Sequence, residues 1–345
     1  MLIETINNAT ILLARCFLED GIQSKNFAFS GLLSYLTLAV INIGLQGPTK
    51  YQLSEYLNNN FTHSSYQMTT NKKAQRRYLV GMEYLESISQ VYSSIFYSGR
   101  TEENFEQMAM ELFDFELFHI HGSTVSQRIQ IVLDWIHEKM PVIGGYSFKM
   151  PFDDEFSTTI LNTCYIKHKW DQMFNTKKTT AQLFTNGYDQ KIVVPMMKNM
   201  DAFKVYEDPM IGSRTLFMPF ENEDIYAAIV VPFHSSIEHI LNKINVRILT
   251  NLRATLFSRE EADMSQMMKD PAYLNDYYQF ASIDINESGT YVEVTPEVIS
   301  NNSTNIPKNI LQFHVDKPFI FYIYARPLKL IIFFAVVTNP IVEWT

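Results

Sequence analysis

The sequence predicts an α+β fold in which two strands near the C-terminal end are joined by a long irregular connection. Ile283 and Ile285 alternate with polar neighbours, which is the period-two pattern of a half-buried strand. Residues 318–324 form an apolar and aromatic run that is typical of a buried strand. The connection between them includes the polar run 300–305, which has no helical periodicity. Because compact domains seldom carry so long a loop without a function, we predict that this loop is the working part of the molecule.

The spacing of apolar residues predicts the helical part of the fold. The first 17 residues place their apolar side chains on one helical face. Residues 32–44 predict a buried helix that ends at a Gly/Pro turn, followed by a short amphipathic helix capped by Thr49. Apolar residues at helical spacing predict two further helices over residues 105–117 and 129–140.

Composition restricts the class of protein. The chain has 345 residues, of which 46% are hydrophobic, and no Pro/Gly/Ser-rich linker divides it, so we predict a single domain over residues 1–345. The net charge of −9 argues against nucleic-acid binding. The sequence contains no apolar stretch of 18 residues, which argues against a transmembrane segment. We expect a monomer.

The N-terminus and the cysteines indicate the cellular compartment. No basic region precedes a compact apolar core and a cleavage site, so we expect an intracellular protein. Cys16 and Cys164 cannot form a disulfide framework, and both lie in apolar surroundings. We therefore predict that both are buried thiols.

Candidate catalytic and metal-binding residues are few. Cys164 and His168 are four residues apart, but no cysteine-protease signature accompanies them. His119 and His121 could share a metal on a strand, but no Cys/Asp/Glu cluster lies nearby in the sequence. Phosphate-binding and dinucleotide-binding fingerprints are also missing. The sequence therefore predicts neither an enzyme nor a metal or cofactor site.

Several motifs around the long loop occur in an order that resembles the serpin family of protease inhibitors. Residues 287–290 resemble the hinge of the family, and residues 317–321 resemble the strand that follows the loop. Residues 331–340 resemble the closing strand and the final Asn-Pro of the family. The resemblance implies the serpin fold, with helices around a large central mixed β-sheet and two smaller sheets. It also implies an exposed reactive-centre loop over about residues 287–312.

Two further motifs resemble the serpin segments that control the opening of the main sheet. Residues 26–31 precede a buried helix, and residues 161–170 include the Asn and Trp of the family pattern. The resemblance implies that Trp170 packs under the top of the main sheet, at the breach where the loop first inserts. Leu33 stands where the family has the second serine of its shutter. The residues that the resemblance assigns to the breach and the shutter are Trp170, Asn26, Ser30, Leu33 and Asn162.

The family pattern is interrupted after residue 243. The sequence passes from 237–243 almost directly into 251–258, so a family segment that includes an edge strand of the main sheet is missing near 243–251. This loss would expose the strand before the hinge unless another segment covers it. Residues 267–273 and the frequent Phe, Tyr, Asn and Ile look most like a poxvirus serpin, which implies an infected host cell as the setting.

The loop itself carries unusual residues for the mechanism that the resemblance implies. A serpin traps a protease when its cleaved loop inserts as a new central strand before the acyl-enzyme is hydrolysed. The residues that would face the core are Thr290, Val292, Val294 and Pro296. Small residues enter quickly, whereas the two valines are bulky. Pro296 has no N–H group, and leaving its partner carbonyl without a hydrogen bond costs roughly 1–3 kcal/mol.

Two functions are compatible with these features. The first is a suicide substrate that inhibits a host serine or cysteine protease, with Glu287, Gly289 and Thr290 in the hinge and cleavage between Ser303 and Thr304. The second is a non-inhibitory binding protein that has kept the serpin fold and contacts another host or viral protein. Neither function requires a cofactor. The extracellular location that is usual for the family is the alternative to an intracellular one.

Overall fold

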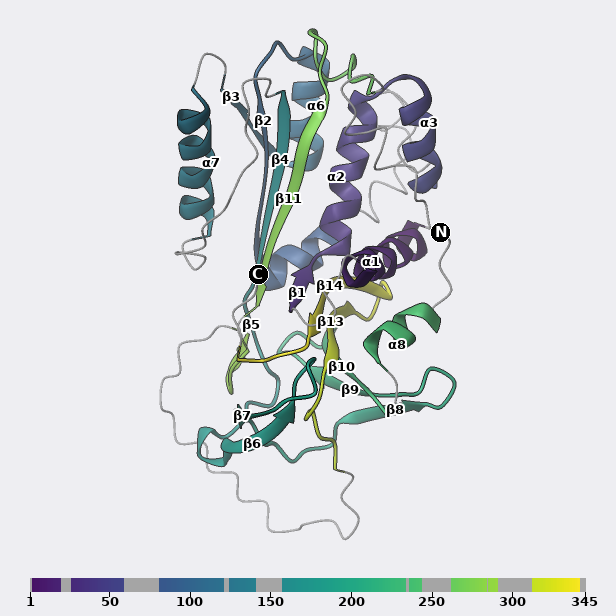
Figure 1. Ribbon diagram of the computed structural model, residues 1–345, viewed down its shortest axis with the longest axis vertical. Helices are drawn as coiled ribbons and strands as arrows, with labels where there is room; N and C mark the ends of the chain where they lie inside the picture. Colours follow the sequence, from purple (N-terminus) through teal and green to yellow (C-terminus); the bar gives the residue numbers. More distant parts are fainter. Residues whose placement is uncertain are drawn as a thin grey trace. The chain divides into compact units, whose positions relative to one another are not determined.

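The computed structural model describes most of the chain (Figure 1). The described residues are 2–19, 26–58, 81–120, 124–140, 157–233, 236–243, 262–283, 285–290 and 312–341. They belong to two compact units. The first unit comprises Met1–Ala9, Ser30–Tyr165 and Arg247–Ala281, and the second comprises Thr10–Phe29, Ile166–Val246 and Ser282–Thr345. The prediction of a single domain stays a prediction.

The first unit is built around a four-stranded sheet with the order β11-β4-β2-β3. Its strands are β2 (Ser89–Tyr97), β3 (Phe115–His119), β4 (Thr158–Ile166) and β11 (Leu274–Ile283). Strands β2 and β3 pair in parallel. Every residue of β4 is buried, whereas residues 275–282 of β11 are half-buried. Among the described strands, β11 therefore lies at one edge of this sheet, and the predicted loss of an edge strand stays a prediction.

Four labelled helices belong to this unit: α2 (Gly31–Gly44), α3 (Gly47–Tyr56), α6 (Glu103–Phe113) and α7 (Val125–Lys139). Ser30 caps α2 by accepting a hydrogen bond from the Leu33 amide. The prediction that Thr49 caps α3 is wrong, because the helix begins at Gly47 and Pro48 occupies its first turn, where no amide donor is needed. The predicted helix over 105–117 is also too long. Asp114 adopts a left-handed conformation that ends α6, and the following residues pair with β2.

Helix α7, which the sequence predicted over residues 129–140, packs against the sheet. Its side chains Val132, Trp135 and Ile136 form a buried cluster with Phe96 of β2 and Leu161 of β4. The Trp135 ring meets Phe96 edge-on at 6.0 Å between centroids. A capping box at Thr124 fixes the start of the helix. Burial of this apolar face therefore holds the helix on the sheet.

The second unit contains a six-stranded sheet with the order β1-β14-β13-β10-β9-β8. All five pairings in it are antiparallel. Its strands are β1 (Phe27–Phe29), β8 (Lys204–Asp208), β9 (Ser213–Pro219), β10 (Ile225–Pro232), β13 (Phe319–Ala325) and β14 (Leu330–Val337). Strands β13 and β14 are the strands that the sequence predicted at residues 318–324 and 331–340 (Figure 1).

Two short strand pairs complete the second unit. Strands β6 (Thr180–Thr185) and β7 (Lys191–Met196) form a hairpin, and β5 (His168–Lys169) pairs with β12 (Gly289–Thr290). A short 3₁₀ helix, η2 (Thr176–Lys178), precedes β6, and helix α8 (Ile237–Lys243) follows β10.

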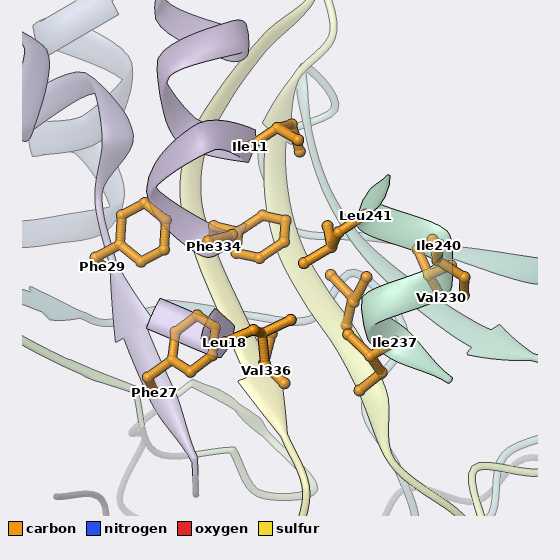
Figure 2. Packing of buried hydrophobic residues seen from close by; sticks show 12 residues of the cluster. Ile11, Leu18, Phe27, Phe29, Val230, Ile237, Ile240, Leu241, Phe334 and Val336 are labelled. Atoms are coloured by element: carbon orange, nitrogen blue, oxygen red, sulfur yellow. The ribbon is translucent and has the colours of Figure 1, made fainter. Parts of the chain in front are cut away.

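The core of the second unit lies between its sheet and two helices, α8 and α1 (Leu2–Glu19), the latter of which begins in the first unit. Figure 2 shows Phe29 of β1 beside Phe334 of β14, with their rings 5.7 Å apart. The buried Arg15 of α1 donates two hydrogen bonds, of 2.9 and 2.6 Å, to the Leu241 carbonyl of α8. Cys164 is buried as predicted, but Cys16 is exposed, because α1 turns it away from the face that carries Ala14 and Leu18.

The described residues contain no helix that is both long and apolar enough to cross a membrane. Likewise, they bring no three side chains of His, Cys, Asp or Glu into a group that could hold a metal ion.

Candidate functional site

The predicted breach residue Trp170 lies at the centre of a compact site in the second unit, which we call the hinge site. It consists of Trp170, Phe174 and Phe220, the turn at residues 286–288, and the paired strands β5 and β12. The Trp170 ring is buried and stacks on Phe220 at 4.6 Å with an interplanar angle of 6°. Its indole Nε1–H donates a 3.1 Å hydrogen bond to the Asn286 carbonyl. An aromatic side chain thus holds the turn that leads into the loop.

The turn itself is held by Asn286 and by backbone hydrogen bonds. The Asn286 side-chain oxygen accepts from the amides of Ser288 at 2.9 Å and Gly289 at 3.2 Å. The Asn286 amide donates to the Gly289 carbonyl at 2.8 Å. On the other side, the amides of Trp170 and Phe174 donate to the carbonyls of Ser288 and Glu287. The chain is therefore reversed within four residues, which aims β12 back along β5.

Gly289 is required where the loop leaves this turn. Its φ of +156° is rarely adopted by residues with a side chain. A Cβ atom at this position would lie 2.3 Å from the His168 carbonyl oxygen and 2.6 Å from Lys169 Cα. The register pairs Gly289 with Lys169 and Thr290 with His168 in antiparallel orientation. The close approach of two backbones explains why the predicted hinge has glycine here.

Two charged or titratable side chains border the hinge site. The Glu287 carboxylate accepts a 2.6 Å hydrogen bond from the Thr179 hydroxyl, which ties the turn to the segment before β6. His168 packs against the Phe220 ring, with centroids 5.4 Å apart. Burial lowers the pKa of His168 below its ordinary value, and the nearby Glu221 carboxylate opposes that shift.

The predicted shutter residues Ser30 and Asn162 lie in a second site, which belongs to the first unit and which we call the polar cluster. Its members come from α2 and its N-cap, from β4 and from β11, and all are linked by hydrogen bonds. They are Ser30, Ser34, Thr37, Asn162, Tyr277 and Gln279. Asn162 is fully buried, and its side-chain amide donates to the hydroxyls of Thr37 at 2.5 Å and Tyr277 at 3.2 Å.

Strand β11 supplies the other half of the polar cluster. The Tyr277 hydroxyl donates to Ser34 at 3.4 Å, and Gln279 brackets the N-cap of α2. The Ser30 amide donates to Gln279 Oε1 at 2.8 Å, and Gln279 Nε2 donates to the Ser30 carbonyl at 3.3 Å. Burial raises the pKa of Tyr277, so its hydroxyl stays protonated and can donate. The cluster joins the neighbouring strands β4 and β11 through side chains as well as through the sheet.

The structure places the other two predicted shutter residues, Asn26 and Leu33, differently from Ser30 and Asn162. Asn26 belongs to the second unit, where its side chain accepts from the amides of Thr338 and Asn339 and fixes the end of β14. Leu33 is buried and takes part through its backbone: its amide donates to the Ser30 hydroxyl, and its carbonyl accepts from the Thr37 hydroxyl at 3.0 Å. The serine that the family has at this position is replaced by Ser34, the next residue, together with Thr37.

Sequence reasoning did not find Tyr277 and Gln279, although a signal was present. In the segment 275–280, the residues at every second position, Asn275, Tyr277 and Gln279, are polar, which marks one face of a strand. All three make hydrogen bonds on that face, Asn275 to the amides of residues 157 and 158. The alternate residues Tyr278 and Phe280 pack with the α7 cluster on the other face.

Most of the predicted cleavage and insertion residues lie outside the part of the chain that the structure describes. Thr290 ends β12, but Val292, Val294, Pro296, Ser303 and Thr304 lie outside the described residues. Most of the predicted gap near 243–251 also lies outside them. These assignments stay predictions.

Cys164 lacks the properties of a nucleophile. It is fully buried in β4, and burial raises the pKa of its thiol to about 12. A thiol with this pKa is almost entirely protonated near neutral pH, and the thiolate is the nucleophilic form. The spacing of Cys164 and His168 therefore does not create a catalytic pair.

The fold and the hinge site together define a class of protein: an α+β molecule in which the short strand β12 pairs with β5 next to a buried tryptophan. A family model described as "Serpin (serine protease inhibitor)" matches residues 4–256 and 247–340. The chain belongs to the serpin family.

The relatives and solved structures that resemble the chain agree with this membership. The chain is 25% identical over 230 residues to antithrombin-III of Ovis aries, a match that covers 55% of this chain and 48% of that protein. It is 26% identical to a superinfection exclusion protein of Variola virus, over 54% of this chain and 57% of the viral protein. The chain thus spans about half the length of the first curated relatives that it matches. The structure of a serpin from the trematode Schistosoma haematobium superposes with a TM-score of 0.77 at 20% identity, over 98% of this chain and 99% of the other, and this likeness shows the fold.

Proposed function

We propose that this chain is a suicide-substrate inhibitor of a serine or cysteine protease. The observation that supports the proposal best is the pairing of Gly289 and Thr290 with β5. A cleaved loop that turns back tightly from one strand and inserts next to it runs antiparallel to that strand. Here the first two loop residues already adopt that pairing, so insertion would extend an existing strand rather than nucleate a new one.

The continuity of the chain indicates where the extended strand would go. Strand β4 leads into β5 after one residue, and β11 leads into the turn at residues 286–288. From the serpin mechanism of loop insertion, we propose that the extended strand would enter between β4 and β11. It would have to separate the Asn162 and Tyr277 side chains, which are joined at 3.2 Å. The polar cluster thus opposes opening of the sheet until a gain in strand pairing offsets its loss.

A second candidate function is a non-inhibitory binding protein. It is favoured by the edge position of β11, since among the described strands only β4 pairs with it. Pro296 at a core-facing position of an inserted strand favours the same function, because proline interrupts a central ladder. In this case the partner would be another host or viral protein rather than a protease.

The setting of either function is also a proposal. We propose action inside an infected host cell, which follows from the sequence resemblance to a poxvirus serpin, with an extracellular location as the alternative.

Thermal unfolding before and after cleavage of the loop tests the proposed inhibitor. The protein would be nicked with elastase, its unfolding midpoint measured, and the mixture run on an SDS gel. Insertion of a strand adds several kcal/mol, which at ~2–4 °C per kcal/mol raises the midpoint by more than about 10 °C. That rise and an SDS-stable adduct are the expected results. An unchanged midpoint without an adduct would reject trapping and favour the binding protein.

A further inference from the structure

The hairpin of β6 and β7 exposes an apolar face that a strand sequence of its kind normally buries. Residues 192–197 form the continuous apolar run Ile-Val-Val-Pro-Met-Met, which is typical of a strand covered on both faces. The structure covers one face only, with Phe184 and Val194 buried. On the opposite face, Leu183 and Val193 are 57% and 63% exposed. The sequence is therefore typical of a strand that is buried on both faces, whereas only one face of this hairpin is buried in the structure.

The exposed residues form a continuous patch rather than scattered side chains. The register pairs Leu183 with Val193 directly, and Ala181 with Pro195 two positions further along the same face. All four are exposed. Lys191, also exposed, stands on this face at the other end, opposite Thr185. We call these five residues, Ala181, Leu183, Lys191, Val193 and Pro195, the hairpin patch.

The hairpin patch is held by the rest of the second unit. The Thr185 amide donates to the Asp316 carbonyl at 2.8 Å, and the Gly187 amide donates to the Thr338 carbonyl at 2.9 Å. Within the turn, the Asn186 side chain accepts from the amides of Tyr188 and Gln190. A fixed surface loses little conformational entropy when it binds, which favours its use as a docking site.

The charge around the patch indicates what binds there. Residues 176–198 carry four lysines and one aspartate, a net charge of +3 in a chain of net charge −9. Two of these lysines lie in η2 before β6, and Lys198 follows β7. Among the described residues, none of the four is in an ion pair. In a symmetric dimer formed through this patch, the lysines of one copy would face the lysines of the other. The resulting repulsion does not favour such a dimer.

We propose that the hairpin patch is a docking site for a segment of a partner protein that combines apolar side chains with carboxylates. The apolar side chains would cover Leu183 and Val193, and the carboxylates would pair with Lys191 and the neighbouring lysines. The hydrogen bond from Thr185 to Asp316 places the hairpin beside residues 312–318, the segment before β13. The site does not depend on trapping and serves the inhibitor and the binding protein equally.

The test uses the dye bis-ANS, an apolar dianion that can be crosslinked by ultraviolet light, on the full chain. Trypsin cleaves after Lys178, Lys191 and Lys198, so label in the patch would be found in peptides 179–191 and 192–198. The double variant L183T/V193T replaces both apolar side chains with threonine, which is compatible with a strand. We expect this variant to lose the label in these peptides and to bind the dye at least fivefold more weakly. The matched control is M210T, since Met210 is 83% exposed in a turn of the same unit, and it should leave both readouts unchanged.

Competition then tests the chemistry of the partner. A peptide of alternating Glu and Leu should displace bis-ANS from the patch, and a peptide of alternating Lys and Leu should not. Label that persists in the double variant, or that lies outside residues 179–198, would overturn the docking site. Displacement by the lysine peptide but not by the glutamate peptide would overturn the proposed chemistry of the partner. Both results are independent of the elastase experiment, so the two proposals fail separately.

Discussion

The hinge site and the polar cluster are both predicted to control the loop, yet they are held together in different ways. The hinge site relies on backbone hydrogen bonds, one glycine and one indole, and most of its contacts join residues close to 170 with residues close to 288. The polar cluster relies on side chains from three elements, and Asn162 at its centre is fully buried.

This difference predicts different responses to substitution. A change in the polar cluster leaves buried polar groups without partners, and that cost is felt by the whole fold. A change in the hinge site alters a strand pair of only two residues, which can open without global unfolding. Substitutions in the cluster should therefore lower the unfolding midpoint, whereas substitutions in the hinge should mainly change local protection.

The largest effect is expected for N162A. The substitution removes the donor to Thr37 and Tyr277 and leaves a cavity in a fully buried strand, so it should destabilise the fold by about 2–4 kcal/mol. At ~2–4 °C per kcal/mol, the midpoint in a thermal scan should fall by roughly 5–15 °C. Y277F, which removes only the hydroxyl, should cost about half as much.

A double-mutant cycle tests whether these residues act as a cluster. Because Asn162 and Tyr277 share a hydrogen bond, N162A/Y277F should be less destabilised than the sum of the single variants by more than ~0.5 kcal/mol. Strict additivity would show that the cluster is a set of independent contacts. It would then give no reason to treat the six residues as one control element.

The next effect, in the hinge site, is expected for G289A. The added Cβ would approach the His168 carbonyl to 2.3 Å, so β12 should separate from β5. Hydrogen exchange of the Trp170 and Phe174 amides should become at least tenfold faster, while the midpoint changes by less than about 2 °C. S288A is the control, because no hydrogen bond of the Ser288 hydroxyl contributes to this turn. A large fall in midpoint for G289A would remove the contrast between the two sites.

The hinge could be predicted from the sequence more fully than the polar cluster, and the reason is physical. Glycine at 289 and tryptophan at 170 have few substitutes, because one must allow two backbones to approach closely and the other must fill a large buried space and donate a hydrogen bond. Both residues could therefore be predicted from short sequence motifs. Apolar patterning likewise predicted helix α2, helix α7 and strand β13.

Polar clusters are harder to predict because many combinations of side chains satisfy the same donors and acceptors. Leu33 replaced an expected serine, and Ser34, Thr37 and Tyr277 provide the hydrogen bonds instead. The sequence motif alone indicates that a serine hydroxyl is missing at residue 33. In the structure, neighbouring side chains form a different hydrogen-bond network in the same region. The end of α6 was misplaced for a related reason, since pairing of residues 115–119 with β2 overrides their helical spacing.

A smaller effect separates the two roles of Trp170. W170F keeps an aromatic ring against Phe220 but removes the donor to the Asn286 carbonyl. We expect a cost of about 0.5–1.5 kcal/mol, measured as faster hydrogen exchange of the Ser288 and Gly289 amides in the turn. N286D keeps the Asn286 carbonyl and a side-chain acceptor and should preserve protection. Equal protection in W170F and the natural protein would show that stacking alone holds the turn.

The smallest expected effect is a dependence on pH that arises at His168. Burial lowers the pKa of this side chain in the folded protein below the value of about 6.5 that it has when exposed. The unfolded chain therefore binds the proton more tightly, so His168 has no effect on stability well above pH 6.5 and destabilises the fold progressively as the pH falls below it. The difference in unfolding midpoint between the natural protein and H168N should accordingly change between pH 7.5 and pH 5, because the midpoint of the natural protein should fall further.

Because His168 pairs with Thr290, the same acidification should accelerate hydrogen exchange in β5 and β12 before it affects the polar cluster. Parallel loss of protection at both sites would mean that the hinge does not open on its own, and the contrast from which these predictions start would not hold.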